Sequence, residues 1–309
     1  MTSAIEVSGL RKTFAKTVVL DGIDLDVRAG TIFSLLGPNG AGKTTTVNVL
    51  TTLMRADSGS VRIDGHDAVT EAKAVRARIG VTGQFAAVDD LLTGRENLQL
   101  MVDLHGGRGK RSVDELLKRF DLVEAAPKPA ATYSGGMRRK LDLAMTLVGD
   151  PRIIFLDEPT TGLDPRSRRT MWDIVRALVA DGVTIFLTTQ YLEEADQLAD
   201  RIAVLDQGRL VAQGSPAELK RQVPGTNVRL AFTAAADLDA AARLFPDAGR
   251  DDESLTLRVP SDGGTTSLRA LLNRLDEHSL SATEFAVDTP DLDDVFLALT
   301  GHNTKVDAE

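Results

Sequence analysis

One run of residues in this 309-residue sequence has the types and spacing of a phosphate-binding loop. The run GPNGAGKT lies between an apolar segment and a helical pattern. Glycines let backbone N–H groups turn inward around phosphate oxygens, and the following helix directs its positive dipole end at the same charge. Lys43 supplies a cation for the β- and γ-phosphates, and the Thr44 hydroxyl is placed to ligate Mg²⁺. The predicted nucleotide-binding residues are Gly37, Pro38, Asn39, Gly40, Ala41, Gly42, Lys43, Thr44 and Thr45.

A second element places two adjacent carboxylates after four apolar residues, in the run IIFLDE at 153–158. Ligands of α/β proteins bind at the carboxyl ends of buried strands. We expect Asp157 to reach Mg²⁺ through water. Glu158 is the candidate base that polarises an attacking water molecule. The structural alternative is a strand that ends in a solvated acidic turn.

A third element is the turn Ser134-Gly135-Gly136, which opens a helical pattern. Such a turn forms a second anion site at a helix amino terminus. One nucleotide does not need two such sites in one subunit.

These three elements, in this order, resemble the ABC ATPase family. The resemblance implies that Ser134, Gly135 and Gly136 of one copy cap the γ-phosphate held by the P-loop of a second copy. Two ATP molecules would then be sandwiched in a head-to-tail dimer.

The same resemblance implies roles for three further residues. Phe14 would stack on adenine, Gln84 would reach Mg²⁺ and the attacking water, and Asp164 would contact the opposite subunit. Each has a structural alternative, because Phe14 could pack in the core, Gln84 could be a polar loop residue and Asp164 could form a turn.

Three positions depart from the general family pattern: Tyr133 and Met137 replace the common Leu and Gln, and Gln190 stands where most members have His. A glutamine amide can donate a hydrogen bond but carries no charge. We therefore expect Gln190 to hold the γ-phosphate by hydrogen bonding. The predicted catalytic residues are Lys43, Gln84, Glu158 and Gln190, and the predicted metal ligands are Thr44, Gln84 and Asp157.

These departures, with the terminal run PDLDDVFLALTG, resemble the daunorubicin/doxorubicin-resistance branch of ABC exporters. Such proteins are ATPases peripheral to the cytoplasmic face of the cell membrane. They pair with a separate six-helix permease and export drugs, antibiotics or lipids. An importer ATPase and a soluble ABC protein acting on nucleic acid remain alternatives.

The pattern of apolar residues predicts an α/β fold in two domains. Residues 1–222 form the nucleotide-binding domain, with a RecA-like core, an antiparallel β subdomain and a helical subdomain at about 88–149. Alternating runs such as TVVLDGIDLDV predict antiparallel strands, and apolar runs such as VTIFLTTQ predict buried parallel strands. The run RIAVLDQGRLVAQG predicts a hairpin that turns at Gln207-Gly208. Residues 223–309 form a small α+β domain, which follows a helix predicted around PAELKRQ. Its predicted strands are VRLAF, SLTLRV and ATEFAVD, and its predicted helices are DLDAAARLF, SLRALLNRLDEH and the final LDDVFLALTG.

Composition weighs against nucleic-acid binding and excludes cysteine chemistry. Asp and Glu number 45 against 36 Lys and Arg, so the net charge of −9 has the wrong sign for binding nucleic acid. The absence of Cys excludes disulfides and thiolate chemistry. No continuous run of apolar residues approaches the length that a membrane-spanning helix requires. The basic triplet Arg138-Arg139-Lys140, beside Asp142, is interpreted as a solvated helix face.

Overall fold

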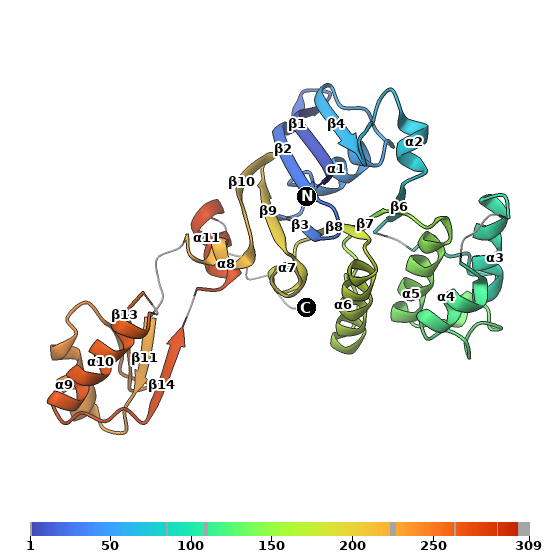
Figure 1. Cartoon of the computed structure of the whole chain (residues 1–309). Coiled ribbons are helices and arrows are strands. Elements are labelled where there is room, and N and C mark those ends of the chain that lie inside the picture. The colour runs from blue at the N-terminus through green and yellow to red at the C-terminus, as the bar shows by residue number, and fades with distance from the viewer. Residues whose placement is uncertain are drawn as a thin grey trace. The chain divides into compact units, whose positions relative to one another are not determined.

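The computed structural model describes residues 2–84, 86–107, 111–222, 227–262, 264–288 and 290–301 (Figure 1). Its contacts divide the chain into a larger unit, Met1–Pro216, and a smaller unit, Ala217–Glu309. The boundary predicted between residues 222 and 223 falls where residues 223–226 lie outside the described ranges. The two-domain assignment therefore stays a prediction.

A six-stranded sheet in the order β10-β9-β3-β8-β7-β6 forms the centre of the larger unit. Every residue of β3 (Ile32–Leu36), β7 (Ile153–Asp157) and β8 (Thr184–Thr189) is buried, as expected for parallel strands covered on both faces. The remaining strands are β6 (Ile79–Thr82), β9 (Arg201–Asp206) and β10 (Arg209–Gly214). All neighbours pair in parallel except β9 and β10, which form the predicted hairpin. The carboxyl ends of β3, β7 and β8 therefore meet at one edge.

A second, antiparallel sheet has the order β2-β1-β4-β5. Its strands are β1 (Ser3–Phe14), β2 (Thr17–Arg28), β4 (Ser58–Ile63) and β5 (His66–Asp67). Apolar side chains of this sheet share one buried cluster with α1 (Lys43–Leu50) and with one face of the parallel sheet. Within that cluster the rings of Phe33 and Phe186 stack with centroids 5.4 Å apart.

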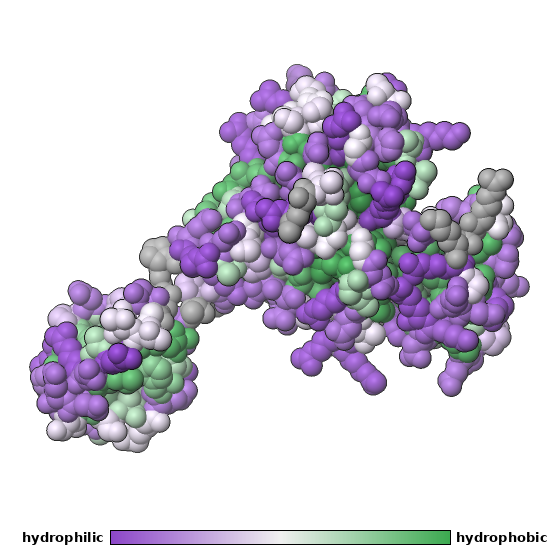
Figure 2. Space-filling view, viewed as in Figure 1, coloured by the Kyte–Doolittle hydropathy of each residue, from purple (hydrophilic) through white to green (hydrophobic). Residues whose placement is uncertain are grey.

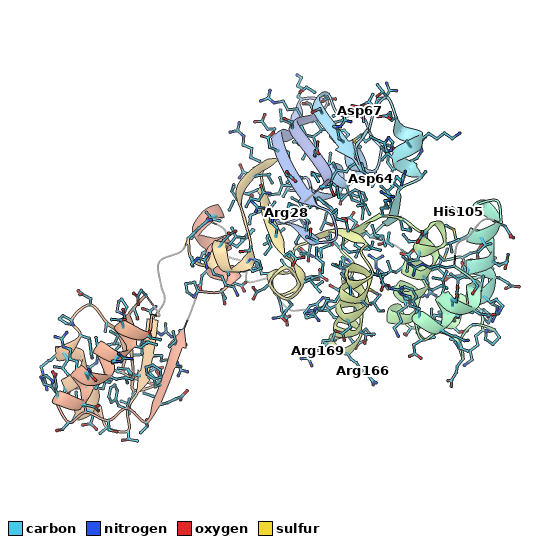
Figure 3. All side chains as sticks on the ribbon, viewed as in Figure 1. Arg28, Asp64, Asp67, His105, Arg166 and Arg169 are labelled. Carbon is cyan, nitrogen blue, oxygen red and sulfur yellow. The ribbon has the colours of Figure 1, made fainter. Side chains whose placement is uncertain are left out.

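The opposite face of the parallel sheet packs against helices in a separate buried cluster. The longest of these is α6 (Pro165–Ala180), which buries Trp172 and Val175. Arg166 and Arg169 project from its exposed face (Figure 3). The other helices of the larger unit are α2 (Ala72–Arg76), α3 (Gly94–Leu104), α4 (Val113–Arg119), α5 (Gly135–Thr146) and α7 (Leu192–Leu198), with short 3₁₀ turns at Ala130–Thr132 and Leu147–Gly149.

Helices α3, α4 and α5 group together beside the β6 end of the sheet (Figure 1). Capping boxes begin two of them, because Thr93 and Ser112 each exchange hydrogen bonds with a glutamate three residues later. Tyr133 joins this group, since its buried hydroxyl donates to the Ala125 carbonyl at 2.8 Å. Burial raises the pKa of that hydroxyl.

The smaller unit contains a four-stranded antiparallel sheet in the order β12-β13-β11-β14. The chain order β11, α9, β12, β13, α10, β14 is that of a split βαβ, or ferredoxin-like, unit. Leu230, Leu257 and Leu271 lie in the apolar core between the sheet and its helices. The strands are Asn227–Ala231, Gly249–Asp251, Thr256–Pro260 and Glu284–Asp288, and the helices are α8 (Pro216–Lys220), α9 (Ala235–Leu244), α10 (Thr265–Glu277) and α11 (Leu292–Thr300). The sequence predicted each of these elements except the three-residue β12.

Hydrophilic residues cover most of the visible surface of the larger unit, with hydrophobic patches between them (Figure 2). Across the described residues, no helix combines the length and hydropathy needed to cross a membrane.

Candidate nucleotide-binding and hydrolysis site

The predicted P-loop joins β3 to α1, and two of its glycines are required by the packing of the chain itself. Gly42 has φ 111°, and a Cβ atom there would lie 2.8 Å from Leu20 Cδ2. A Cβ atom at Gly37 would lie 2.3 Å from the Leu205 carbonyl oxygen. Gly40 has φ 81° and open space at its Cβ position, so its backbone conformation alone favours glycine.

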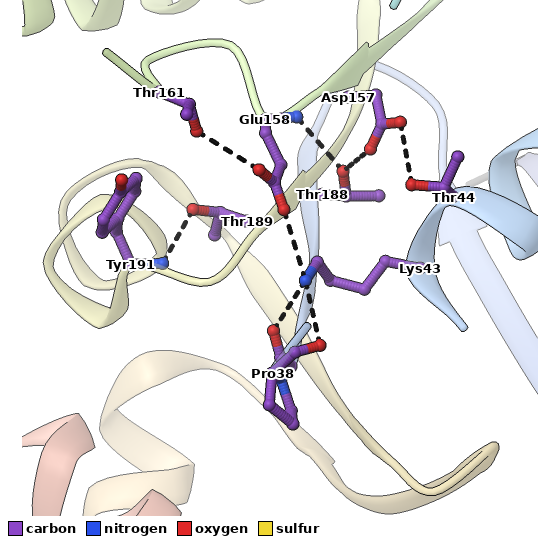
Figure 4. A network of polar contacts seen from close by, with 10 residues as sticks. Pro38, Lys43, Thr44, Asp157, Glu158, Thr161, Thr188, Thr189 and Tyr191 are labelled. Carbon is purple, nitrogen blue, oxygen red and sulfur yellow. Dashed lines mark hydrogen bonds and ion pairs between the residues drawn. The ribbon is translucent and has the colours of Figure 1, made fainter. Parts of the chain in front are cut away.

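Lys43 begins α1, and its ammonium group is almost fully buried. Its Nζ donates to the carbonyl oxygens of Gly37 at 2.8 Å and Pro38 at 3.2 Å (Figure 4). It also forms an ion pair with Glu158 Oε1 at 3.4 Å. Burial lowers the pKa of Lys43, and the neighbouring Glu158 carboxylate opposes that shift. A lysine ammonium has three donors, so all three are engaged.

The Asp157 carboxylate lies at the carboxyl end of β7 and faces the first turn of α1. Its Oδ2 accepts a hydrogen bond from Thr44 Oγ1 at 3.1 Å, and its Oδ1 accepts one from Thr188 Oγ1 (Figure 4). Carboxylate and hydroxyl oxygens are ligands that suit Mg²⁺. The sequence analysis missed Thr188, which reaches this site because β8 pairs with β7.

Glu158 follows Asp157 in a left-handed backbone conformation, with φ 48°. Such a conformation costs about 1–3 kcal/mol for a residue with a side chain, and the surrounding contacts must hold it. The Glu158 N–H donates to Thr188 O at 3.1 Å and to Thr188 Oγ1 at 3.2 Å. Its Oε2 accepts from Thr161 Oγ1 at 3.3 Å. Both ends of the residue are thereby fixed next to Lys43.

The Ser134-Gly135-Gly136 turn forms the amino terminus of α5. Ser134 is the N-cap, and its Oγ accepts a hydrogen bond from Met137 N at 3.3 Å. Ser134 and Gly135 are exposed. A Cβ atom at Gly136 would lie 2.7 Å from Ser167 Oγ, so close packing against α6 requires glycine there. The turn thus presents a helix amino terminus to its surroundings, as the anion-site prediction requires.

Asp164 forms the amino terminus of α6. Its Oδ1 accepts from Arg166 N and Ser167 N, each at 3.0 Å. The Ser167 hydroxyl and backbone N–H lower the pKa of this carboxyl. Asp164 is therefore an N-cap residue, and its contact with a second subunit stays a prediction. No hydrogen bond or ion pair between described residues joins Asp164 or Ser134 to the Lys43 network.

Three further predicted site residues lie on loops or at strand ends. Phe14 ends β1 with 43% of its surface exposed, and Lys12 Nζ lies 5.6 Å from its ring centroid, so the core-packing alternative does not hold. Gln84 is exposed and Gln190 is half-buried. Neither glutamine side chain hydrogen-bonds to a residue within the described ranges.

Arg139 is buried, with 7% of its surface exposed, and the interpretation of its helix face as solvated is wrong at this residue. Its guanidinium donates to the carbonyl oxygens of Gly83 at 2.7 Å, Asp157 at 3.1 Å and Pro159 at 3.1 Å. Asp142 Oδ2 lies 3.5 Å from Arg139 Nη1. The charge pattern on α5 did not distinguish this arginine from its neighbours, because the packing of α5 against β6 and β7 decides which side chain turns inward.

Glu194 on α7 is a second buried charged group that the sequence analysis missed. It has no exposed surface, and its Oε1 accepts from Trp172 Nε1 at 3.1 Å. Burial raises the pKa of its carboxyl. The hydrogen bond between Trp172 and Glu194 joins α6, which follows Asp164, to α7, which follows Gln190.

Sequence comparisons find relatives along the whole chain. The profile of the ABC transporter family matches residues 20–161. The chain is 50% identical over 309 residues to the daunorubicin resistance ATP-binding protein DrrA3 of Streptomyces coeruleorubidus, covering 98% of each chain. It is 44% identical over 314 residues to the doxorubicin resistance ATP-binding protein DrrA of Mycobacterium tuberculosis, covering 98% of this chain and 95% of that protein. It is 38% identical over 309 residues to the Nod factor export ATP-binding protein I of Ralstonia nicotianae, covering 98% and 96%.

Solved structures of ATP-binding cassettes share the fold. An ATP-binding subunit of an ABC transporter superposes with a TM-score of 0.64 at 27% identity, covering 71% of this chain and 92% of that chain. A dimeric cassette in a post-hydrolysis state, bound to ADP and Pi, superposes with a TM-score of 0.61 at 26% identity, covering 68% and 98%. The predicted P-loop cassette fold is confirmed.

Proposed function

This chain belongs to the ATP-binding subunits of ABC transporters, in the daunorubicin/doxorubicin-resistance branch, and we propose that it powers export of a hydrophobic drug, antibiotic or lipid. The observation that carries the proposal is the end-to-end likeness to drug-resistance subunits, which includes the smaller unit. The importer and nucleic-acid alternatives have no such support. A separate membrane permease conducts the exported molecule, and the chain lies at the cytoplasmic face of the cell membrane.

The network around Lys43 supports the proposed assignment of ATP-binding residues. Lys43 would donate to the β- and γ-phosphates, and the backbone N–H groups of residues 39–45 would surround them. Phe14 would stack on the adenine ring. Thr44 and Asp157, whose oxygens already lie 3.1 Å apart, would hold Mg²⁺ with Gln84. When bound, Mg²⁺ neutralises charge on the phosphate oxygens.

Glu158 would orient the attacking water and accept its proton. Its carboxylate is held beside Lys43, the residue that would contact the phosphate being transferred. Gln84 and Gln190 would contribute hydrogen bonds to the water and the γ-phosphate. Replacing Gln190 with Ala should slow steady-state hydrolysis by the transporter complex, and an unchanged rate would remove Gln190 from the catalytic residues.

The exposed amino termini of α5 and α6 support a head-to-tail homodimer. Ser134 and Gly135 would cap the γ-phosphate of ATP held by a second copy, and Asp164 would contact that copy. ATP touches both subunits only when they meet, so its binding would shift the population toward the closed dimer. Closure would drive the permease from one access state to the other.

Transport in inverted membrane vesicles tests the export proposal. Vesicles would come from cells that express the full chain with the permease that co-purifies with it, and doxorubicin fluorescence would report uptake. We expect ATP-dependent uptake with the wild type and none with Glu158→Gln, which should accumulate as an ATP-bound dimer. Wild-type vesicles that hydrolyse ATP but transport neither doxorubicin nor fluorescent lipid would refute export of these molecules.

A further inference from the structure

Arg139 and Asp142 form a buried ion pair on α5, the helix that begins at the Ser-Gly-Gly turn. Three guanidinium nitrogens of Arg139 reach main-chain carbonyls of two other segments, with donor–acceptor distances from 2.7 to 3.1 Å. Asp142 Oδ2 lies 3.5 Å from Arg139 Nη1, and Asp142 Oδ1 accepts from Ala87 N at 3.1 Å. A buried charge needs such partners, so the pair is fixed in one geometry.

The three carbonyls and the one N–H adjoin the residues proposed to act in hydrolysis. Gly83 immediately precedes Gln84, and Ala87 lies three positions after it. The Asp157 carbonyl is part of the peptide bond between Asp157 and Glu158, and the Pro159 carbonyl lies one residue after Glu158. The ion pair therefore forms hydrogen bonds with the backbone on both sides of Gln84 and on both sides of Glu158.

Glu158 has a special need for this support, because its φ of 48° is costly for a residue with a side chain. The Glu158 N–H is held by Thr188, and the flanking carbonyls are held by Arg139. Without the arginine, the segment 157–159 would lose the contacts that keep the Glu158 carboxylate beside Lys43.

We propose that Arg139, oriented by Asp142, is a positioning residue for ATP hydrolysis that fixes Gln84 and Glu158 relative to the Ser-Gly-Gly terminus of the same helix. This inference rests on the proposed roles of Gln84 and Glu158. Among the described residues, the hydrogen bonds of Arg139 go to main-chain carbonyls and to Asp142, and none goes to the P-loop. Arg139 therefore acts on the rate of hydrolysis and leaves ATP affinity unchanged.

The geometry requires arginine. Its planar guanidinium presents five N–H donors in a rigid fork, and three of its nitrogens reach carbonyls that lie in different directions. A lysine ammonium would keep the charge next to Asp142 but would concentrate its donors at one point. Arg139→Lys therefore separates the loss of positioning from the loss of charge.

The test is made on the full chain in membranes with its permease. We expect Arg139→Lys to lower kcat roughly 10- to 100-fold, the loss that a misplacement of about 1 Å can cause. The Kd for ATP, measured without Mg²⁺, should stay within about twofold of the wild-type value, because the P-loop contacts remain. Lys140→Gln is the matched control and should keep the wild-type kcat, because it changes an adjacent charge whose ion pair within the described ranges is a 3.9 Å contact with the exposed Asp121.

A double-mutant cycle separates positioning from general destabilisation. If Arg139 acts through Glu158 and Gln84, adding Arg139→Lys to Glu158→Gln should reduce the residual single-turnover rate by a smaller factor than Arg139→Lys reduces the wild-type rate. Should Arg139→Lys fail to fold, Arg139→Gln/Asp142→Asn removes both buried charges and serves in its place. A wild-type kcat in a folded variant, or equal losses in kcat, ATP affinity and thermal stability, would overturn the proposal. None of these measurements uses the exported molecule, so their outcome does not depend on whether the export proposal holds.

Discussion

Glu158→Gln should tighten nucleotide binding in the absence of Mg²⁺. All three donors of the Lys43 ammonium are occupied in the structure, by Gly37 O, Pro38 O and Glu158 Oε1. Lys43 must release one acceptor before it can donate to a phosphate. The Glu158 contact is the longest of the three, at 3.4 Å, and is the one we expect to break.

The magnitude follows from the charge of that acceptor. A hydrogen bond to a charged group contributes about 1.5–3 kcal/mol, and one to a neutral group contributes about 0.5–1.5 kcal/mol. Replacing the carboxylate by an amide should therefore reduce the competition for Lys43 by about 1–1.5 kcal/mol. At 1.4 kcal/mol per tenfold, the Kd should fall roughly 5- to 12-fold.

Equilibrium titration with ADP and with ATP, in EDTA to prevent hydrolysis, measures the effect. ADP is the decisive ligand, because it has no γ-phosphate to repel the Glu158 carboxylate, and its tighter binding would report release of Lys43 alone. Thr161→Val is the control, since it removes the 3.3 Å contact to Glu158 Oε2 and leaves Lys43 untouched. An ADP affinity equal to that of the wild type would refute the competition between Glu158 and phosphate.

Three further changes test other parts of the structure. Thr188→Val removes the hydroxyl that donates to Asp157 and should lower the free energy of unfolding by about 1.5–3 kcal/mol in urea titrations, whereas Thr188→Ser should restore it. Gly94→Ala places a Cβ atom 2.1 Å from the Tyr133 hydroxyl and should lower the melting temperature, and Tyr133→Phe, which removes that oxygen, should lower it less in the Gly94→Ala variant than in the wild type. Burial raises the pKa of Glu194, so the folded state keeps the proton that the unfolded state releases as pH rises above about 4.5. The free energy of unfolding of the wild type should therefore decrease as the pH rises above about 4.5. Glu194→Gln does not titrate and can still accept from Trp172, so its melting temperature should fall less between pH 5 and pH 8.

The parts of the fold and site that the sequence predicted are those with local signals. The P-loop, the acidic end of β7 and the Ser-Gly-Gly turn are each defined by a few neighbouring residues. The hairpin at Gln207-Gly208 was predicted from a turn signal, and both residues have positive φ angles. Long apolar runs likewise predicted β3, β7 and β8.

The parts that the sequence did not predict depend on which segments meet in space. Thr188 is one polar residue in a buried strand, and only the pairing of β8 with β7 brings its hydroxyl to Asp157. Arg139 carries the same charge as its neighbours on α5, and only the packing of that helix buries it. The strand Gly249–Asp251 has no apolar residue, so its pairing with β13 left no periodic signal.

The position of β3 in the middle of the parallel sheet determines when this protein can first hold a nucleotide during synthesis. Both neighbours of β3 come from much later in the chain, since Ile32 pairs with Ile185 and Phe33 pairs with Arg201. At ~5–20 residues per second, roughly ten to thirty seconds of translation separate the P-loop strand from the strands that flank it. A nascent chain that ends before residue 184 therefore has a complete P-loop sequence without the sheet that shapes it. Ribosome-bound chains should acquire nucleotide binding only after β9 has left the exit tunnel.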